Sequence, residues 1–159
     1  MSLHFQVDIA FDFREDTPED IICGLENLAH SRPLTEQQKQ CLPKMFESEI
    51  TGMTGNLSFV GRDVYYFKKH YRCTRNGTDI YKWTFHFRTM LSDDVFYEEG
   101  YPLLAWLALY SDTNGFVGYI REEFDEESRL LYFGNGEVRL KESVDKEIRF
   151  KYSDFEVKY

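Results

Sequence analysis

Six basic or histidine side chains recur at even spacings in two neighbouring runs of the sequence. Lysine and arginine neutralise anions, and histidine exchanges a proton near neutral pH. If both runs are β-strands, residues an even number apart point to the same side of the sheet. We therefore predict one surface for a small anionic ligand or a binding partner, made by Lys68, His70, Arg72, Lys82, His86 and Arg88.

The two histidines of this set do not form a metal site. His70 and His86 are four strand positions apart in the predicted pairing, which is about 13 Å at the rise of a β-strand. Ligands of one zinc ion each lie within about 2 Å of it, so this separation excludes a shared ion. The acidic run over residues 122–127 lacks the ligand spacing and central glycine of a calcium loop. We predict no metal ion and no cofactor.

Catalysis has two candidates in the sequence. Asp8 and Asp12 of the first predicted strand can meet the basic side chains of this surface, as general bases or as cross-strand ion pairs. Ion pairs are favoured because no nucleophile or second acid accompanies them. Cys73 is flanked by arginines but lacks a neighbouring base. We predict no catalytic residue.

A β-hairpin over residues 64–88 must position these side chains, because Asn76-Gly77 separates two runs rich in aromatic and β-branched residues. A two-residue loop would place basic groups among buried aromatic rings, which is costly unless each is paired. A three-residue loop ending at Gly77 pairs Thr74 with Thr78 and brings the rings to one face. We predict this three-residue loop, with the pairs Tyr71/Tyr81, Lys69/Trp83, Phe67/Phe85 and Tyr65/Phe87.

Composition sets the class of protein. The 159 residues are 42% hydrophobic and 17% aromatic, which favours one folded domain over residues 1–159. The formal net charge of −9 argues against nucleic acid and anionic membranes as partners. Three cysteines without a CxxC pair or a secretory leader favour free thiols in the cytoplasm. No apolar run reaches the roughly 18 residues of a membrane helix.

Periodicity predicts the other elements. Apolar residues alternate with polar ones from Phe5 to Phe13, as in a half-buried strand. Thr17-Pro18 begins an amphipathic helix, and the apolar run 103–109 predicts a helix buried on most sides. Residues 34–56 contain a short helix and a long connection, which is a lid or a simple insertion. Further strands are predicted at 57–60, 116–124, 129–133, 137–140 and 148–159.

This order predicts an α+β fold, with an antiparallel β-sheet, helices packed on one face, and a ferredoxin-like βαββαβ core with extra C-terminal strands. The strands at 116–124 and 129–133 are apolar on both faces, with Val117 and Tyr119 on one side and Phe116 and Ile120 on the other. A partner is expected to cover such a corner.

Two functions follow from these patterns. We expect a non-enzymatic cytoplasmic interaction module whose sheet face or edge binds a protein partner and can self-associate as a homodimer. The alternative is a small-molecule binding domain or enzyme that uses the basic sheet face for an anionic ligand.

Overall fold

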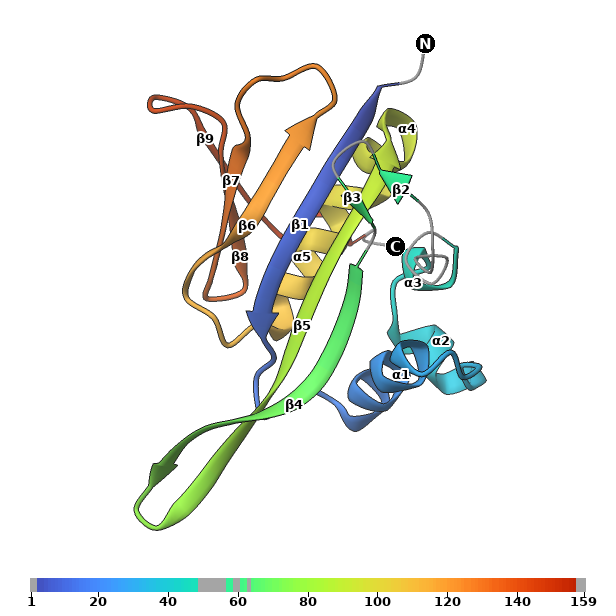
Figure 1. Ribbon diagram of the computed structural model, residues 1–159, viewed down its shortest axis with the longest axis vertical. Coiled ribbons are helices and arrows are strands. Elements are labelled where there is room, and N and C mark those ends of the chain that lie inside the picture. Colours follow the sequence, from blue (N-terminus) through green and yellow to red (C-terminus); the bar gives the residue numbers. More distant parts are fainter. Residues whose placement is uncertain (1–2, 49–56, 59–60, 63, 157–159) are drawn as a thin grey trace.

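A seven-stranded antiparallel sheet forms the centre of the computed structural model, which describes residues 3–48, 57–58, 61–62 and 64–156 (Figure 1). The strand order is β4-β5-β1-β6-β7-β8-β9. The strands are β1 (His4–Asp12), β4 (Val64–Arg75), β5 (Thr78–Ser92), β6 (Gly115–Glu122), β7 (Arg129–Gly134), β8 (Glu137–Lys141) and β9 (Glu147–Lys151).

The predicted first strand lies in the middle of the sheet, between β5 and β6. Its odd-numbered side chains, from Phe5 to Phe13, are all buried, which confirms the alternation in the sequence. Outside this sheet, β2 (Leu57–Ser58) and β3 (Gly61–Arg62) form a small ladder. Of the predicted strand 57–60, residues 57–58 form β2, and residues 59–60 lie outside the described residues.

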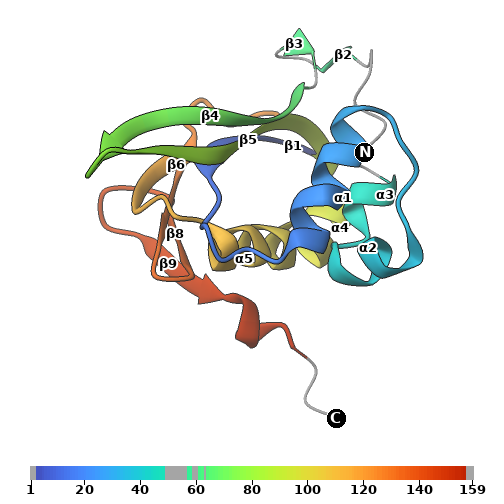
Figure 2. The ribbon, with the colours of Figure 1, turned by 90° about the horizontal axis from the view of Figure 1, so that it is seen from below.

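The helices cover one face of the sheet (Figure 2). In chain order they are α1 (Glu19–Ala29), α2 (Glu36–Cys41), α3 (Met45–Ser48), α4 (Asp93–Val95), a π-helical turn (Phe96–Gly100) and α5 (Tyr101–Tyr110). A capping box of Thr35 and Gln38 begins α2. Every residue of α5 from Leu103 to Ala108 is buried, as the apolar run predicts. No helix in the described residues is both long and apolar enough to cross a bilayer.

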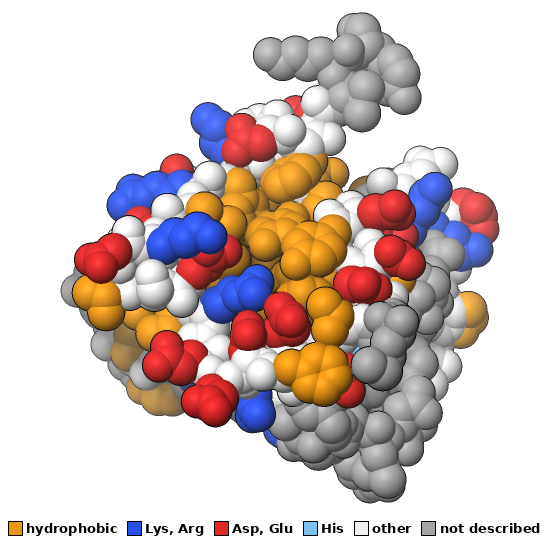
Figure 3. Space-filling view, turned by 90° about the horizontal axis from the view of Figure 1, so that it is seen from above, with side chains coloured by type: hydrophobic (Ala, Val, Ile, Leu, Met, Phe, Trp, Pro, Cys, Tyr) orange, Lys and Arg blue, Asp and Glu red, His pale blue; other side chains and the backbone are white. Residues whose placement is uncertain are grey.

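Aromatic side chains fill the space between the sheet and the helices. Phe85 is fully buried, and rings of β1, β4 and α3 surround it, including Phe11, Phe67 and Phe46. Seen from the end where β1 begins, hydrophobic side chains gather at the centre of the molecule, and acidic and basic side chains ring them (Figure 3). The high aromatic content of the chain therefore lies mainly in one continuous core.

The predicted loop of the long hairpin is wrong, and so is the pair of Thr74 with Thr78, because Thr74 pairs with Asp79; the four other predicted pairs are correct. Arg75 pairs with Thr78, so the loop has two residues, and Asn76 (φ 51°) and Gly77 (φ 77°) both adopt left-handed conformations. A β-bulge between Tyr71 and Cys73 then shifts the register by one residue. Below it the four predicted pairs occur, including Phe67 opposite Phe85.

A second bulge corrects the predicted faces of the strand at 116–124. The register between β6 and β7 shifts between Phe116 and Gly118. Val117 and Ile120 are both buried on the helix side, whereas Phe116 is 57% exposed. Gly118 permits this arrangement, because a Cβ atom there would lie 2.0 Å from the backbone oxygen of Asp8. The helix side of this corner therefore carries Val117 and Ile120, and the outer side carries Phe116 and Tyr119.

The C-terminal strand is shorter than predicted. β9 ends at Lys151, and a 3₁₀ turn (Tyr152–Asp154) follows it. Of the predicted range 148–159, residues 157–159 lie outside the described residues. Within the connection at 34–56, two short helices occur, and residues 49–56 are likewise outside the description.

Candidate binding site

The far half of the β4–β5 hairpin projects past the body of the sheet (Figure 1). β1 pairs with β5 only as far as Asp12 opposite Thr84. Residues 68–83 therefore form a two-stranded ribbon, called the hairpin arm below. The arm holds five of the chain's 19 Lys and Arg residues and one of its 28 Asp and Glu residues. It is a basic element on a chain of net charge −9.

Arg72 of the predicted surface is paired with a carboxylate. Its guanidinium donates hydrogen bonds of 2.9 and 2.6 Å to Asp12, and Thr84 donates one of 2.6 Å to the same group. Burial alone would raise the pKa of Asp12, but the hydrogen bonds from Arg72 and Thr84 outweigh burial and lower it. The positive charge of Arg72 is thus already neutralised within the fold.

Lys82 is neutralised by two loops, one that follows β1 and one that joins α5 to β6. Its Nζ lies 3.2 Å from Glu15 Oε1 and 3.0 Å from Asp112 Oδ2. Burial would lower the pKa of Lys82, but the hydrogen bonds that Lys82 donates to Asp112 and Glu15 raise it on balance. Sequence reasoning missed both partners, because only the packing of β1 against β6 and α5 brings these loops to the arm.

His86 and Arg88 share the carboxylate of Asp8, which faces them from β1. His86 Nε2 lies 2.9 Å from Asp8 Oδ1. Arg88 Nε lies 3.3 Å from Asp8 Oδ2, close enough for charge attraction but not aligned for a hydrogen bond. Tyr119 donates a further bond of 3.4 Å to Asp8. Asp8 therefore serves as an ion-pair partner for two residues of the predicted surface.

His70 and Lys68 differ from the other four. His70 Nε2 shares a hydrogen bond of 2.6 Å with the Tyr66 hydroxyl, and Lys68 Nζ lies 5.8 Å from the centre of the Tyr66 ring. Neither has a carboxylate partner among the described residues. The structure thus spreads the six predicted residues along the outer face and pairs four of them with acids.

A hollow on the outer face of the arm is a candidate place for an anion. It has a volume of about 330 Å³ and is lined by Cys73, Ile80 and the charged residues Glu15, Arg72, Arg75, Lys82 and Asp112. Three cations and two acids therefore line it together. Within the described part of the chain, no group of three or more His, Cys, Asp or Glu residues could hold a metal ion.

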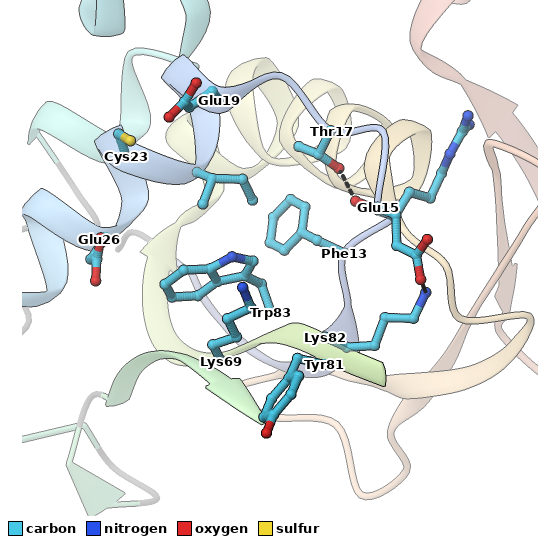
Figure 4. A pocket seen from close by; sticks show the side chains of 12 residues that line it. Phe13, Glu15, Thr17, Glu19, Cys23, Glu26, Lys69, Tyr81, Lys82 and Trp83 are labelled. Carbon is cyan, nitrogen blue, oxygen red and sulfur yellow. Dashed lines mark hydrogen bonds and ion pairs between the residues drawn. The ribbon is translucent and has the colours of Figure 1, made fainter. Parts of the chain in front are cut away.

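The larger cleft lies on the opposite side of the arm, facing α1 (Figure 4). Its volume of about 390 Å³ is within the roughly 300–1,000 Å³ typical of ligand pockets. Phe13 and Trp83 form its apolar floor, and Trp83 stacks on Phe67 with the ring centres 4.7 Å apart. The rings are therefore held in place before any ligand arrives.

One stripe of α1 forms the acidic wall of the cleft. Glu19, Cys23 and Glu26 are spaced i, i+4 and i+7, so they lie on the same side of the helix, with Ile22 beside them (Figure 4). Burial and the negative charges of Glu19, Glu26 and Asp20 raise the pKa of the Cys23 thiol. This spacing was visible in the sequence, but only the fold shows which element the stripe faces.

Most of the other charges around the cleft are already engaged. Arg14 is bound to Asp16, and Lys82 is bound to Glu15. Lys69 Nζ lies 6.0 Å from the centre of the Tyr81 ring, on the hairpin side of the cleft. Among the described residues Glu19 and Glu26 have no ion-pair partner, so the unpaired charge on the helix side is negative.

The cleft lies beside an open edge of the sheet. β4 is the first strand in the order, and it pairs only with β5 in the described residues. At the near end of this edge the Tyr65 hydroxyl donates a hydrogen bond of 2.9 Å to the carbonyl of Leu25, which fastens α1 to β4. A strand edge, an apolar floor and a helix wall therefore enclose the same space.

Comparison of the chain with protein-family models, with curated proteins and with solved structures gives no match.

Proposed function

We propose that this chain is a non-enzymatic interaction module that binds an extended segment of a partner protein at the open edge of β4. The segment adds a strand to the sheet, and the cleft beside α1 takes the side chains on one face of that strand. The carrying observation is the position of the cleft between α1 and an unpaired strand edge. Main-chain hydrogen bonds give affinity in this mode of recognition, and pockets for alternate side chains give specificity.

The charges of the arm define the outer side of the added strand. The edge from Lys68 to Arg75 carries four Lys and Arg residues and no acidic residue. Of these, Arg72 is bound to Asp12 and Lys69 lines the cleft, whereas Lys68 and Arg75 have no carboxylate partner among the described residues. Two such edges from two copies would place like charges opposite each other, which opposes pairing. The partner strand that we propose is therefore acidic on the face turned away from the cleft, and a second copy joined through β4 is disfavoured.

A second candidate is a small anionic ligand in the hollow on the outer face of the arm. Arg75 lines this hollow and has no carboxylate partner among the described residues. Inorganic pyrophosphate and citrate are suitable probes. A rise in melting temperature with either anion, lost in Arg75→Gln, supports this function, and the absence of any rise overturns it.

The fold and location that we propose are a ferredoxin-like core and the cytoplasm. The connection through α1 joins β1 to β4, and these two strands lie on either side of β5. The connection through α5 joins β5 to β6, and these two strands lie on either side of β1. This interleaving supports a split βαβ arrangement, extended by β7, β8 and β9.

The three cysteines, Cys23, Cys41 and Cys73, are all free, which supports a reducing compartment.

The experiment that tests strand addition uses a blocked peptide of sequence Glu-Lys-Glu-Val-Glu-Lys-Glu. Its acidic side chains match the outer side of the arm, and its other side chains match the cleft. We expect amide signals of β4 between Lys68 and Arg75 to shift in NMR titrations and their hydrogen exchange to slow. Amides of residues 78–82 on β5 serve as the internal reference, because the strand is added on the other side of the ribbon.

The matched control is Glu-Glu-Lys-Lys-Val-Glu-Glu, which has the same composition without the alternation. Equal effects of the two peptides, or protection absent from β4, would overturn the proposed function. Sedimentation of the free protein over a range of concentrations tests the second copy as occupant. If the protein forms a dimer and hydrogen exchange along β4 slows as the dimer forms, the strand bound at β4 is that of a second copy of this chain and not of a different partner.

A further inference from the structure

We infer that the cleft beside α1 selects a lysine or arginine side chain of the bound strand, with the stem over the apolar floor and the charge at Glu19 and Glu26. This inference rests on the proposed function, because it names the side chain that the added strand would present.

The shape of the cleft suits a long cationic side chain. Trp83 of the hairpin lies across the cleft from α1, which carries Glu19 and Glu26 (Figure 4). Ile22 of α1 adds apolar surface to the lining. Lysine and arginine lay their methylene stems along apolar surface and keep the charged end in a polar environment. An acidic or short polar side chain would leave the floor uncovered.

The wall of the cleft formed by α1 is negatively charged, which suits a cationic side chain. Glu19 and Glu26 are not neutralised by other described residues, and both act on Cys23 between them. The raised pKa of the Cys23 thiol is the response of an acid to burial and to negative charge nearby. Lys69 is held on the opposite wall, against the ring of Tyr81. Because Lys69 lies on the edge strand itself, a ligand cation must reach past it to the carboxylates of α1.

The first test compares the alternating peptide with a version in which both lysines are norleucine, which keeps the stem and removes the charge. We expect the dissociation constant to rise about tenfold, as for the loss of a charge-assisted contact. The doubly substituted protein Glu19→Gln, Glu26→Gln should weaken binding of the lysine peptide by a similar factor and leave binding of the norleucine peptide unchanged. Glu127→Gln, an exposed loop substitution, is the control for net charge.

The second test needs no peptide and reads the cleft directly. In a Cys41→Ser, Cys73→Ser protein only Cys23 reacts with thiol reagents. When each rate is divided by that reagent's rate with 2-mercaptoethanol, trimethylammonium-ethyl methanethiosulfonate should modify Cys23 about fivefold faster than the sulfonate-ethyl reagent, because two carboxylates lie nearby. The rate ratio should fall in the Glu19→Gln, Glu26→Gln protein and persist in Glu127→Gln.

The two tests separate the inference from the proposed function. Protection of β4 by both the lysine and the norleucine peptide with equal affinity would overturn the cation preference and leave strand addition standing. Absence of β4 protection together with a strong preference for the cationic reagent would overturn strand addition alone. Equal rates for the two reagents would overturn the inference about the cleft.

Discussion

Arg72 on β4 binds Asp12 on β1 across the strand that lies between them. The guanidinium Nε and Nη2 donate to the two carboxylate oxygens of Asp12, at 2.9 and 2.6 Å. On the intervening β5, Thr84 accepts from Arg72 and donates to Asp12. Arg72 is the additional residue of the β-bulge between Tyr71 and Cys73, and bulges change the direction of a side chain. The bulge therefore corrects the register of the arm and also ties its base to the sheet.

Replacement of Arg72 by Gln is expected to lower the free energy of unfolding by about 1 kcal/mol at pH 7, a value limited by the partial exposure of the pair. The lowered pKa of Asp12 gives the direction of the pH dependence. The contribution is present above the unfolded pKa near 3.8 and is lost as the pH falls through the folded value. Urea unfolding at pH 7 and pH 3 should show the difference shrinking in acid.

Arg75→Gln is the matched control, because Arg75 is exposed at the arm tip. Its substitution should leave stability within about 0.5 kcal/mol of the parent protein at both pH values. Equal losses for the two variants would contradict the role of the Asp12 pair.

Gly118→Ala should be far more destabilising than Gly115→Ala, although both glycines lie on β6 with positive φ. A Cβ at Gly118 would lie 2.0 Å from the Asp8 backbone oxygen, whereas nothing lies within 4 Å of one at Gly115. We expect a loss of more than about 3 kcal/mol at position 118 and about 1 kcal/mol at position 115. Thermal unfolding measures both, and similar melting temperatures would refute a tight β1–β6 approach.

Tyr65→Phe should loosen α1 from β4 without disturbing the core. The variant removes the hydrogen bond of 2.9 Å to the Leu25 carbonyl and keeps the ring, at a cost of about 1 kcal/mol. Hydrogen exchange of α1 amides should quicken more than exchange in β5. Binding of the alternating peptide should weaken, because α1 forms a wall of the cleft.

Tyr65 also sets an alkaline limit on stability. Burial raises the pKa of its hydroxyl far above the value of 10.0 for an exposed tyrosine. Because the folded pKa is raised, its contribution is complete below pH 10 and is lost as the pH increases beyond that value. Unfolding between pH 9 and pH 12 should become easier in the parent protein and less so in Tyr65→Phe.

Cys23 should react with iodoacetamide more slowly than Cys73. Burial and the charges of Glu19, Glu26 and Asp20 raise the pKa of Cys23, so the reactive thiolate is scarce at pH 8, and Cys73 is exposed. Mass spectrometry of peptides after timed labelling measures both rates. Reaction of Cys23 first would contradict the negative potential of the cleft wall.

The sequence reveals much of the fold through period and composition. Strict alternation from Phe5 to Phe13 identifies a half-buried strand wherever it lies in the sheet, and the apolar run from Leu103 to Ala108 requires a buried helix. The pairs Phe67/Phe85 and Tyr71/Tyr81 also follow from parity, because burying lysine and arginine among rings is costly.

The two bulges were not predictable from such patterns. Each bulge inserts one residue, at Arg72 and at Val117, and residues on the two sides of the insertion no longer alternate between the faces of the sheet. The length of a loop then does not determine which residues face the core further along the strand. At the hairpin both patterns hold, because the bulge at Arg72 lets the two-residue Asn-Gly turn and the burial of the rings occur together. On β6 the alternation misled, since no local feature of the sequence marks the approach of Gly118 to β1.

Types and spacing of residues alone determined an antiparallel α+β protein, its half-buried first strand, its buried helix and a basic run along the long hairpin. Only the tertiary structure decided that Asp8, Asp12, Glu15 and Asp112 neutralise most of that run, and that Glu19 and Glu26 line the open cleft instead. The physical reason is that charge pairing depends on contacts between segments far apart in the chain, whereas strand and helix periodicity is a local property.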